Sequence, residues 1–451
     1  MTDVRERAGF EAWLERQLEH SARQMLRSIS PVAIVKQRPG FGQTVRPIAG
    51  AIVASPVLAD WKPDPDYFFH WFRDSAVVVD ALRLLHLEGR VGDEALRHLR
   101  DFTRFSLALN GLDGRVDAAV RDRRARVAPD FLQYLRDDDD LARAHGDAVA
   151  AETRVNPDGT LDVSRWARPQ HDGAPLRALA MLRWANSVRL DAALLDEVAT
   201  LIRFDLGFTL RRWREPSFDI WEEESGHHYY TLRVAAAALA EGAAWLEGRG
   251  DAAQARPCRD ASQRVFAMLD GFRTEEGEAA HYRSRGLVGE PPSAKALDIA
   301  VILSAIHTHG SAPEHGVADP CMQATLARLE ALFDAAYPIN HGRPAGRGPA
   351  MGRYAGDVYF SGGAYYFSTL GAAEFCFRAA ALGGSASHGW FDRGDAYLET
   401  VRAYTPAGGD LSEQFDQTTG AQTSAKHLAW SYAAFVSCVH ARRAAAVPRR
   451  R

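Results

Sequence analysis

Twelve stretches of helical periodicity run along the chain, and this repetition constrains the fold more than any other feature. Apolar residues recur three and four positions apart, as at Val78, Ala81, Leu82 and Leu85, whereas the alternation typical of strands is scarce. Helices are predicted over 10–28, 73–88, 93–109, 173–187, 190–212, 227–247, 252–270, 293–308, 319–336, 361–383, 389–404 and 424–442, with room for another within 115–147.

Clusters of aromatic and charged residues precede every second helix of the series. They lie at 67–74, 166–173, 221–224, 352–359 and around Glu413. In a closed ring of helices that alternate in direction, these loops would converge at one end. The pattern predicts an all-α fold, an (α/α)6 barrel of twelve helices with its active site at one end. Because no Pro/Gly/Ser-rich linker divides the chain, residues 1–451 are expected to form a single domain.

Composition narrows the possible partners. The chain has 451 residues, a formal net charge of -4 and 46% hydrophobic residues, as expected for a globular protein with a large core. No basic stripe interleaved with aromatic residues is present, which argues against a nucleic-acid partner. The N-terminal stretch lacks an apolar signal core and no segment is long enough to span a membrane, so we expect a cytoplasmic protein without a membrane partner. The oligomeric state stays open.

Neither the cysteines nor the histidines have the spacing of a metal site. The cysteines are far apart and are expected to be free, buried thiols: Cys258, Cys321, Cys376 and Cys438. The histidines of the motif loops also lack a ligand pattern: His70, His171, His227 and His228. We therefore expect no metal.

Two distant segments, 218–224 and 411–416, place glutamates beside aromatic residues, each in a loop ahead of a helix. Glycoside hydrolysis needs two carboxyl groups, one that protonates the leaving oxygen and one that activates water or attacks the sugar. Alone, the run Glu222–Glu224 is typical of a charged helix N-terminus. The neighbouring Trp221 and the similar segment around Glu413 favour a catalytic pair instead.

Other motif residues have both a structural and a functional interpretation. Arg73 and Asp74 form either a structural ion pair or a buried fork of hydrogen bonds to sugar hydroxyls. Trp166 and Trp430 fit a core position and a pocket wall equally well.

Several motifs, taken in order, resemble the glucoamylases of glycoside hydrolase family 15, above all the fungal-type catalytic domain. The resemblance extends from about Phe10 to Ala434, nearly the whole chain. Its motifs lie at 51–56 with 66–75, at 168–173, at 219–223, and at 412–416 with Gln422 and 428–434. It implies an exo-acting, inverting α-glucosidase that needs no metal or organic cofactor and acts on gluco-oligosaccharides.

The resemblance also assigns roles to individual residues. Glu222 matches the general acid and Glu413 the general base that activates water. Arg73 and Asp74 match the pair that grips the terminal glucose. The remaining matches are residues near the water (Tyr67 and Gln414), aromatic walls (Trp71, Trp166, Trp221 and Trp430) and residues around the next sugar (Glu223 and Arg353).

The chain departs from the family pattern at three places. Tyr365 stands where the family usually has Trp, His171 stands where the fungal enzymes have Arg, and 224–230 replaces a more neutral segment. We expect these changes to lie near the leaving-group side and to affect linkage preference, and Tyr365 is included among the substrate-binding residues.

Other functions remain open at this stage. The leading interpretation is release of β-glucose from non-reducing ends of short α-1,4 gluco-oligosaccharides, with α-1,6 as a further linkage. An α-1,6-glucosidase of isomaltose or dextran and a trehalase would use the same barrel. A phosphorylase is disfavoured because Glu413 occupies the position of the base. A non-catalytic carbohydrate-binding regulatory module is a different class, which the presence of both glutamates disfavours.

Overall fold

The computed structural model describes residues 2–446 apart from 61, 275–278, 288–289, 291–292 and 311–313. Twelve helices of eight residues or more lie within this part of the chain, and each overlaps one of the twelve predicted ranges. Two helices start well away from their predicted positions: the first begins at Thr2 rather than at 10, and the eighth begins at Ala300 rather than at 293. The Asp298 carboxylate accepts hydrogen bonds from the backbone N–H of Ala300 at 2.8 Å and from Arg285 at 3.0 Å, and these contacts hold the preceding segment as a loop.

Six of these helices form a closed inner ring. Contacts link α2 to α6, α6 to α8, α8 to α10, α10 to α12, α12 to α14, and α14 back to α2. The inner helices are α2 (Phe72–Leu87), α6 (Gly173–Ser187), α8 (Tyr229–Glu247), α10 (Ala300–His307), α12 (Tyr366–Ala381) and α14 (Ala429–Ala446).

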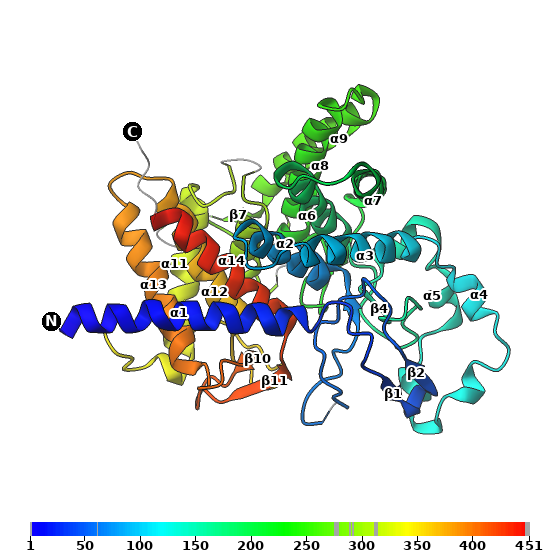
Figure 1. Cartoon of the computed structure of the whole chain (residues 1–451), viewed down its shortest axis with the longest axis horizontal. Helices are drawn as coiled ribbons and strands as arrows, with labels where there is room; N and C mark the ends of the chain where they lie inside the picture. The colour runs from blue at the N-terminus through cyan, green and yellow to red at the C-terminus, as the bar shows by residue number, and fades with distance from the viewer. Residues whose placement is uncertain are drawn as a thin grey trace.

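The other six form an outer ring, each packed against an inner neighbour. α1 contacts α14, α3 contacts α2, α7 contacts α6, α9 contacts α8, α11 contacts α10, and α13 contacts α12; Figure 1 shows α1 (blue) beside α14 (red). The outer helices are α1 (Thr2–Leu26), α3 (Glu94–Leu109), α7 (Ala192–Arg212), α9 (Ala252–Leu269), α11 (Pro320–Ala336) and α13 (Ser387–Tyr404). The two rings make the predicted (α/α)6 barrel.

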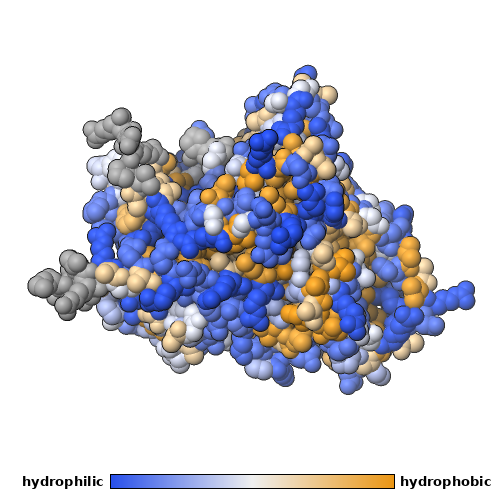
Figure 2. All heavy atoms as spheres, viewed as in Figure 1, coloured by the Kyte–Doolittle hydropathy of each residue, from blue (hydrophilic) through white to orange (hydrophobic). Residues whose placement is uncertain are grey.

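Burial distinguishes the two rings. The inner α12 is buried at nearly every position from Tyr366 to Ala380, whereas the outer α3 buries only one face. Hydrophilic residues cover most of the visible face of α1, and apolar residues gather above this helix and beyond its carboxyl end (Figure 2). None of the helices within the described residues is both long and apolar enough to cross a membrane.

Short strands and turns build the loops. Among the described residues, the strands are β1 (Lys36–Arg38), β2 (Gln43–Val45), β3 (His70–Trp71), β4 (Arg154–Val155), β5 (Ser217–Phe218), β6 (Ser225–Gly226), β7 (Arg273–Thr274), β8 (His281–Tyr282), β9 (Ala364–Tyr365), β10 (Ser412–Phe415) and β11 (Gln422–Lys426). They pair antiparallel as β1–β2, β3–β4, β5–β6 and β7–β8, and β10 lies between β9 and β11. β3, β6, β9 and β11 each lead into an inner helix, so these pairings fix the loops at one end of the barrel.

The segment between α3 and α6 holds two further short helices and several 3-10 turns. The short helices are α4 (Gly114–Ala118) and α5 (Asp138–Ala142). The 3-10 turns in the described chain are η1 (Pro39–Phe41), η2 (Arg124–Arg126), η3 (Pro129–Tyr134), η4 (Gly146–Ala151), η5 (Asp270–Phe272) and η6 (Pro338–Asn340). The helix expected within 115–147 is thus divided into short pieces. The four cysteines are free, and three of them are buried.

Candidate active site

A pocket lies where the loops before the inner helices meet. Nine of the predicted site residues line it: Tyr67, Trp71, Arg73, Asp74, Trp221, Glu222, Arg353, Glu413 and Trp430. Ala54, Ile220, Phe367 and Leu428 complete the lining. The side chains of Trp430 and Phe367 stack with ring centroids 4.4 Å apart. Both belong to inner helices, so residues of the barrel interior form part of the pocket wall.

The loop that carries Glu222 is closed by the pairing of β5 with β6. Asp219 organises this loop from within: its carboxylate accepts hydrogen bonds from the backbone N–H groups of Glu223 at 2.9 Å and Glu224 at 2.8 Å. Arg285 donates to the same carboxylate at 3.0 Å. Burial raises the pKa of Asp219, but Arg285 and the backbone donors outweigh it and hold that pKa below its ordinary value.

Glu222 has a left-handed backbone conformation, with φ of 67°. This conformation is uncommon outside glycine and often occurs where the surrounding structure holds a functional side chain in place. Glu222 and Glu223 make separate contacts: the carboxylate of Glu222 meets Trp71, Arg73 and Trp166, whereas that of Glu223 meets a different group of residues.

Three donors converge on Glu222. Trp71 Nε1 donates to Oε1 at 2.9 Å, Arg73 Nη2 donates to the same oxygen at 3.1 Å, and Trp166 Nε1 donates to Oε2. Each of these contacts stabilises the carboxylate form of the side chain and fixes its orientation. If Glu222 gives up a proton during a reaction, the negative charge therefore develops among preorganised donors.

Glu413 approaches from β10, and its side chain is more deeply buried. Ser424 on β11 donates its hydroxyl proton to Glu413 Oε2, and the Tyr67 hydroxyl lies 3.5 Å from Oε1. Burial raises the pKa of Glu413 to about 7, and the Ser424 hydroxyl acts in the opposite direction. A carboxylate with a raised pKa is a better proton acceptor near neutral pH, as a general base requires.

Arg73 and Asp74 lie in the first turn of α2, and both are buried and line the pocket. Their charged groups lie 3.6 Å apart, and Arg73 also donates to Asp172 at 3.2 Å. Burial raises the pKa of Asp74 to about 6, although the adjacent Arg73 lowers it. A buried cation and carboxyl group are thus held side by side, in an arrangement suited to pairing with vicinal hydroxyl groups.

Aromatic rings enclose the carboxyl groups. Trp71 lies 5.1 Å from Tyr67 and 6.3 Å from Trp166, measured between ring centroids. Trp221 stacks on Trp430 at 6.5 Å. Such faces suit the apolar faces of sugar rings. The pocket therefore combines two carboxyl groups, a charged pair and aromatic walls.

The model of the family described as "Glycosyl hydrolases family 15" matches residues 39–107, 150–391 and 392–440. The chain belongs to glycosyl hydrolase family 15. The match includes every predicted site residue.

Curated relatives of this family 15 chain include fungal proteins. It is 28% identical over 446 residues to "Glucoamylase" of Neurospora crassa, covering 89% of the chain and 64% of the relative. It is 28% identical over 445 residues to "Glucoamylase P" of Amorphotheca resinae, covering 88% and 65%. The chain thus spans slightly less than two thirds of the length of these two relatives.

Solved structures support the fold. The family 15 glucoamylase from Hypocrea jecorina superposes with a TM-score of 0.76 at 22% identity, covering 98% of this chain and 75% of that one. The glucoamylase from Saccharomycopsis fibuligera gives a TM-score of 0.75 at 21% identity, covering 97% and 96%. Their barrel matches the two rings described above.

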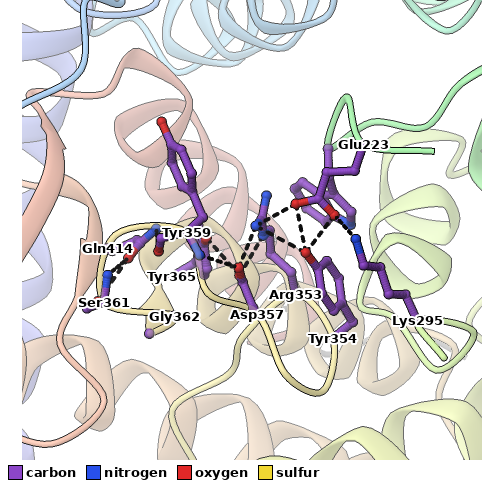
Figure 3. Close-up of polar contacts among 12 residues, drawn as sticks. Glu223, Lys295, Arg353, Tyr354, Asp357, Tyr359, Ser361, Gly362, Tyr365 and Gln414 are labelled. Atoms are coloured by element: carbon purple, nitrogen blue, oxygen red, sulfur yellow. Dashed lines mark hydrogen bonds and ion pairs between the residues drawn. The ribbon is translucent and has the colours of Figure 1, made fainter. Parts of the chain in front are cut away.

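Four predicted site residues of the family 15 chain lie outside the pocket lining. Trp166 reaches the pocket through its bond to Glu222, and Glu223 lies in an outer network with Arg353 (Figure 3). Tyr365 and Gln414 are fully buried. The structure therefore places these last two behind the pocket wall rather than on its surface.

Tyr365 and Gln414 support the wall from behind. The Tyr365 hydroxyl donates to Asp357 at 2.9 Å and accepts a hydrogen bond from Gln414 Nε2 at 2.8 Å. Asp357 in turn accepts two bonds from Arg353, each at 2.6 Å (Figure 3). Tyr365 thus acts on the pocket through Asp357 and Arg353. Its expected position near the leaving-group side is corrected, because it is fully buried behind the pocket wall.

His171 and His228 also lie away from the pocket. Both line a second cavity with Phe208, Trp213 and Thr231. Burial lowers the pKa of His171 to about 4 and lowers that of His228. These departures from the family pattern therefore do not place histidine side chains against a leaving group. Within the described residues, no cluster of three or more His, Cys, Asp or Glu side chains could hold a metal ion.

Sequence reasoning missed several residues of the site. Asp219 lay within a recognised motif, and its position two residues before Trp221 was a usable signal for a loop anchor. Ser424 and Phe367 carried no such signal. Ser424 reaches Glu413 through strand pairing, and Phe367 enters the pocket from the inner ring.

Proposed function

We propose that this chain is an exo-acting α-glucoside hydrolase that releases glucose from the non-reducing ends of short gluco-oligosaccharides, chiefly α-1,4-linked, with inversion of configuration. The observation that carries the proposal is that Glu222 and Glu413, from distant loops, line one pocket beside Arg73 and Asp74. The names of the fungal relatives add support.

An exo-acting enzyme needs a pocket that accepts a chain end. Trp430 and Phe367 of the inner helices line this pocket together with Arg73 and Asp74. In the proposal, the buried pair binds hydroxyls of the terminal glucose, while the tryptophans cover its faces. The sugars farther along the chain extend outward past Arg353 and Glu223.

The proposed reaction uses the two glutamates in complementary roles. Glu222 donates its proton to the glycosidic oxygen as the bond from that oxygen to the anomeric carbon breaks, and the bonding electron pair stays on the oxygen. Water forms the new bond to the anomeric carbon and gives its proton to Glu413. The donors from Trp71, Arg73 and Trp166 stabilise the carboxylate that Glu222 becomes.

The test is glucose release from maltose, isomaltose, trehalose, maltoheptaose and dextran, measured side by side. We expect maltose and maltoheptaose to be cleaved best. Glu222→Gln and Glu413→Gln should each lose about 10²–10⁴-fold in activity while keeping the fold. Preferred cleavage of isomaltose and dextran, or of trehalose, would replace the α-1,4 assignment by one of the two alternative specificities.

The alternative function, a carbohydrate-binding module without catalysis, predicts a different result. Wild-type protein would then bind maltoheptaose but release no glucose from any of the five substrates. Near-normal turnover by either glutamine variant would remove that glutamate from the catalytic pair.

A further inference from the structure

Lys295 lies at the outer edge of the active site, opposite the loop that carries the catalytic glutamate. It belongs to the loop before α10, and Figure 3 shows its side chain extending toward Glu223. Its Nζ lies 2.6 Å from Glu223 Oε2 and 3.7 Å from Glu224 Oε1. No motif of the sequence analysis included this lysine.

Glu223 is the central acceptor of the outer network, which it forms with Lys295, Arg353 and Tyr354. Its carboxylate accepts hydrogen bonds from the Tyr354 hydroxyl at 2.6 Å and 2.7 Å, from Arg353 Nη2 at 3.1 Å and from Lys295 Nζ at 2.6 Å. Lys295 also lies over the Tyr354 ring, with Nζ 4.8 Å from its centroid. Glu223 directly follows Glu222 in the chain, so this network adjoins the proposed acid.

The cations of this network are shared unequally among its carboxylates. Arg353 makes two bonds to Asp357, so the positive charge of Arg353 is balanced mainly by that residue. Glu224 accepts a hydrogen bond from Ser293 at 3.0 Å and lies 3.1 Å from Arg285, which also contacts Asp219 and Asp298 but not Glu223. Lys295 therefore supplies the cation that balances Glu223.

The Lys295–Glu223 pair is partly exposed and adjoins the pocket through Arg353, which lines the pocket and donates to Glu223. Their side chains keep 29% and 26% of their surface accessible, whereas Arg353 keeps 7%. An ammonium group has three donors and Glu223 takes one of them, so this partly exposed lysine can donate to a further hydroxyl group. In the proposed function, the terminal glucose binds deeper, beside Arg73 and Asp74. The unit next to it, which leaves, is the one that can meet this pair.

We propose that Lys295 determines specificity for the leaving sugar: it holds the Glu223 carboxylate in place and donates a hydrogen bond to a hydroxyl of that sugar. The inference rests on the proposed function, whose terminal glucose and leaving group it presupposes. The ligand class is a neutral glycosyl unit with free hydroxyls. A leaving group without hydroxyls gains nothing from the lysine.

The test compares two substrates that share the terminal glucose. Maltose has a sugar as leaving group, and phenyl α-glucoside has an aromatic ring without hydroxyls. Lys295→Met removes the charge and keeps the apolar stem, and Lys295→Arg keeps the charge. We expect Lys295→Met to lower kcat/KM for maltose about tenfold or more, as for loss of a charged hydrogen bond. The value for phenyl α-glucoside should change less than about twofold.

The effect should appear mainly in KM for maltose, because the contact is made both before and during the reaction. Lys295→Arg should recover most of the lost maltose activity. Lys426→Met is the matched control: Lys426 forms an ion pair with Asp64 at 2.8 Å outside the pocket lining, and its removal should alter neither substrate.

The outcomes separate the inference from the proposed function. Equal losses on both substrates, or no loss on either, would overturn the role of Lys295. A wild-type protein that releases no glucose from either substrate would refute the proposed function itself. Retained activity of Lys295→Met on phenyl α-glucoside shows that the variant is folded, so a selective loss on maltose supports the inference.

Discussion

Removal of the Ser424 hydroxyl should move the acid limb of the pH profile to higher pH. Ser424 donates to Glu413 Oε2, and the Tyr67 hydroxyl is 3.5 Å from the other oxygen, too far for a strong O–H···O bond. Among the described contacts, Ser424 is thus the strong donor to this carboxylate. Its bond lowers a pKa that burial raises to about 7.

The size of the effect follows from the type of bond. A hydrogen bond to a charged group contributes about 1.5–3 kcal/mol, and a factor of ten in a protonation equilibrium corresponds to about 1.4 kcal/mol. Ser424→Ala should therefore move the acid limb of kcat/KM upward by about one pH unit or more. The base must be ionised to act, so activity falls at low pH. Because Glu222 must be protonated to act, the profile is bell-shaped, and its maximum also moves to higher pH.

The assay is kcat/KM for maltose as a function of pH. Ser424 has a φ of 63°, so Ser424→Ala keeps the strained backbone conformation, whereas Ser424→Gly removes the hydroxyl and relieves that strain. If the acid limb moves by the same amount in both variants, the shift is due to loss of the hydroxyl rather than to the backbone. Ser431→Ala is the control, since that buried hydroxyl donates to the Ser412 carbonyl at 2.8 Å and not to Glu413. An unmoved limb, or a uniform loss at every pH, would refute the reasoning.

Three further predictions follow from the site. The pKa of Glu413 is raised from 4.5 to about 7 in the folded state, so the wild type loses stability as the pH rises from 4.5 to 7. Glu413→Gln should therefore be more stable than wild type by about 3 kcal/mol at pH 8. Thermal unfolding should show this difference disappear near pH 4.5. Asp219→Asn should lower kcat at least about tenfold, because the loop that carries Glu222 loses its anchor. Asp416 holds a similar turn outside the pocket lining, so Asp416→Asn should leave kcat unchanged. Equal effects of the two substitutions would show that Asp219 does not position Glu222. Glucose first released from maltose should be the β anomer by proton NMR, and early α-glucose would contradict a water-activating Glu413.

The sequence alone predicted the helices and their order. Twelve amphipathic or apolar stretches were long enough for the 3.6-residue periodicity to be read directly, and the motif loops before alternate helices indicated the ring. Glu222 and Glu413 stood out because each lies among aromatic residues. These are local properties of the chain, so local reasoning could find them.

The tertiary structure decided what surrounds each of these groups. In the pairing of β10 with β11, Ser412 lies opposite Lys426 and Gln414 opposite Thr423, so β11 carries one extra residue near Ser424. Such a bulge turns a side chain aside, and here it accompanies the contact of Ser424 with Glu413. Nothing in the local sequence signals it, because the left-handed position is occupied by serine rather than glycine.

Long-range packing likewise decided the roles of Tyr365 and Lys295. The sequence predicted Tyr365 near the leaving-group side, but Tyr365 is fully buried and acts through Asp357. Lys295, which lies in no motif, contacts Glu223 from a different loop. Burial and loop-to-loop contact depend on where distant segments come together when the ring closes. The chain therefore determined by itself which carboxyl groups were candidates, and only closure of the barrel determined which hydroxyls and cations hold them.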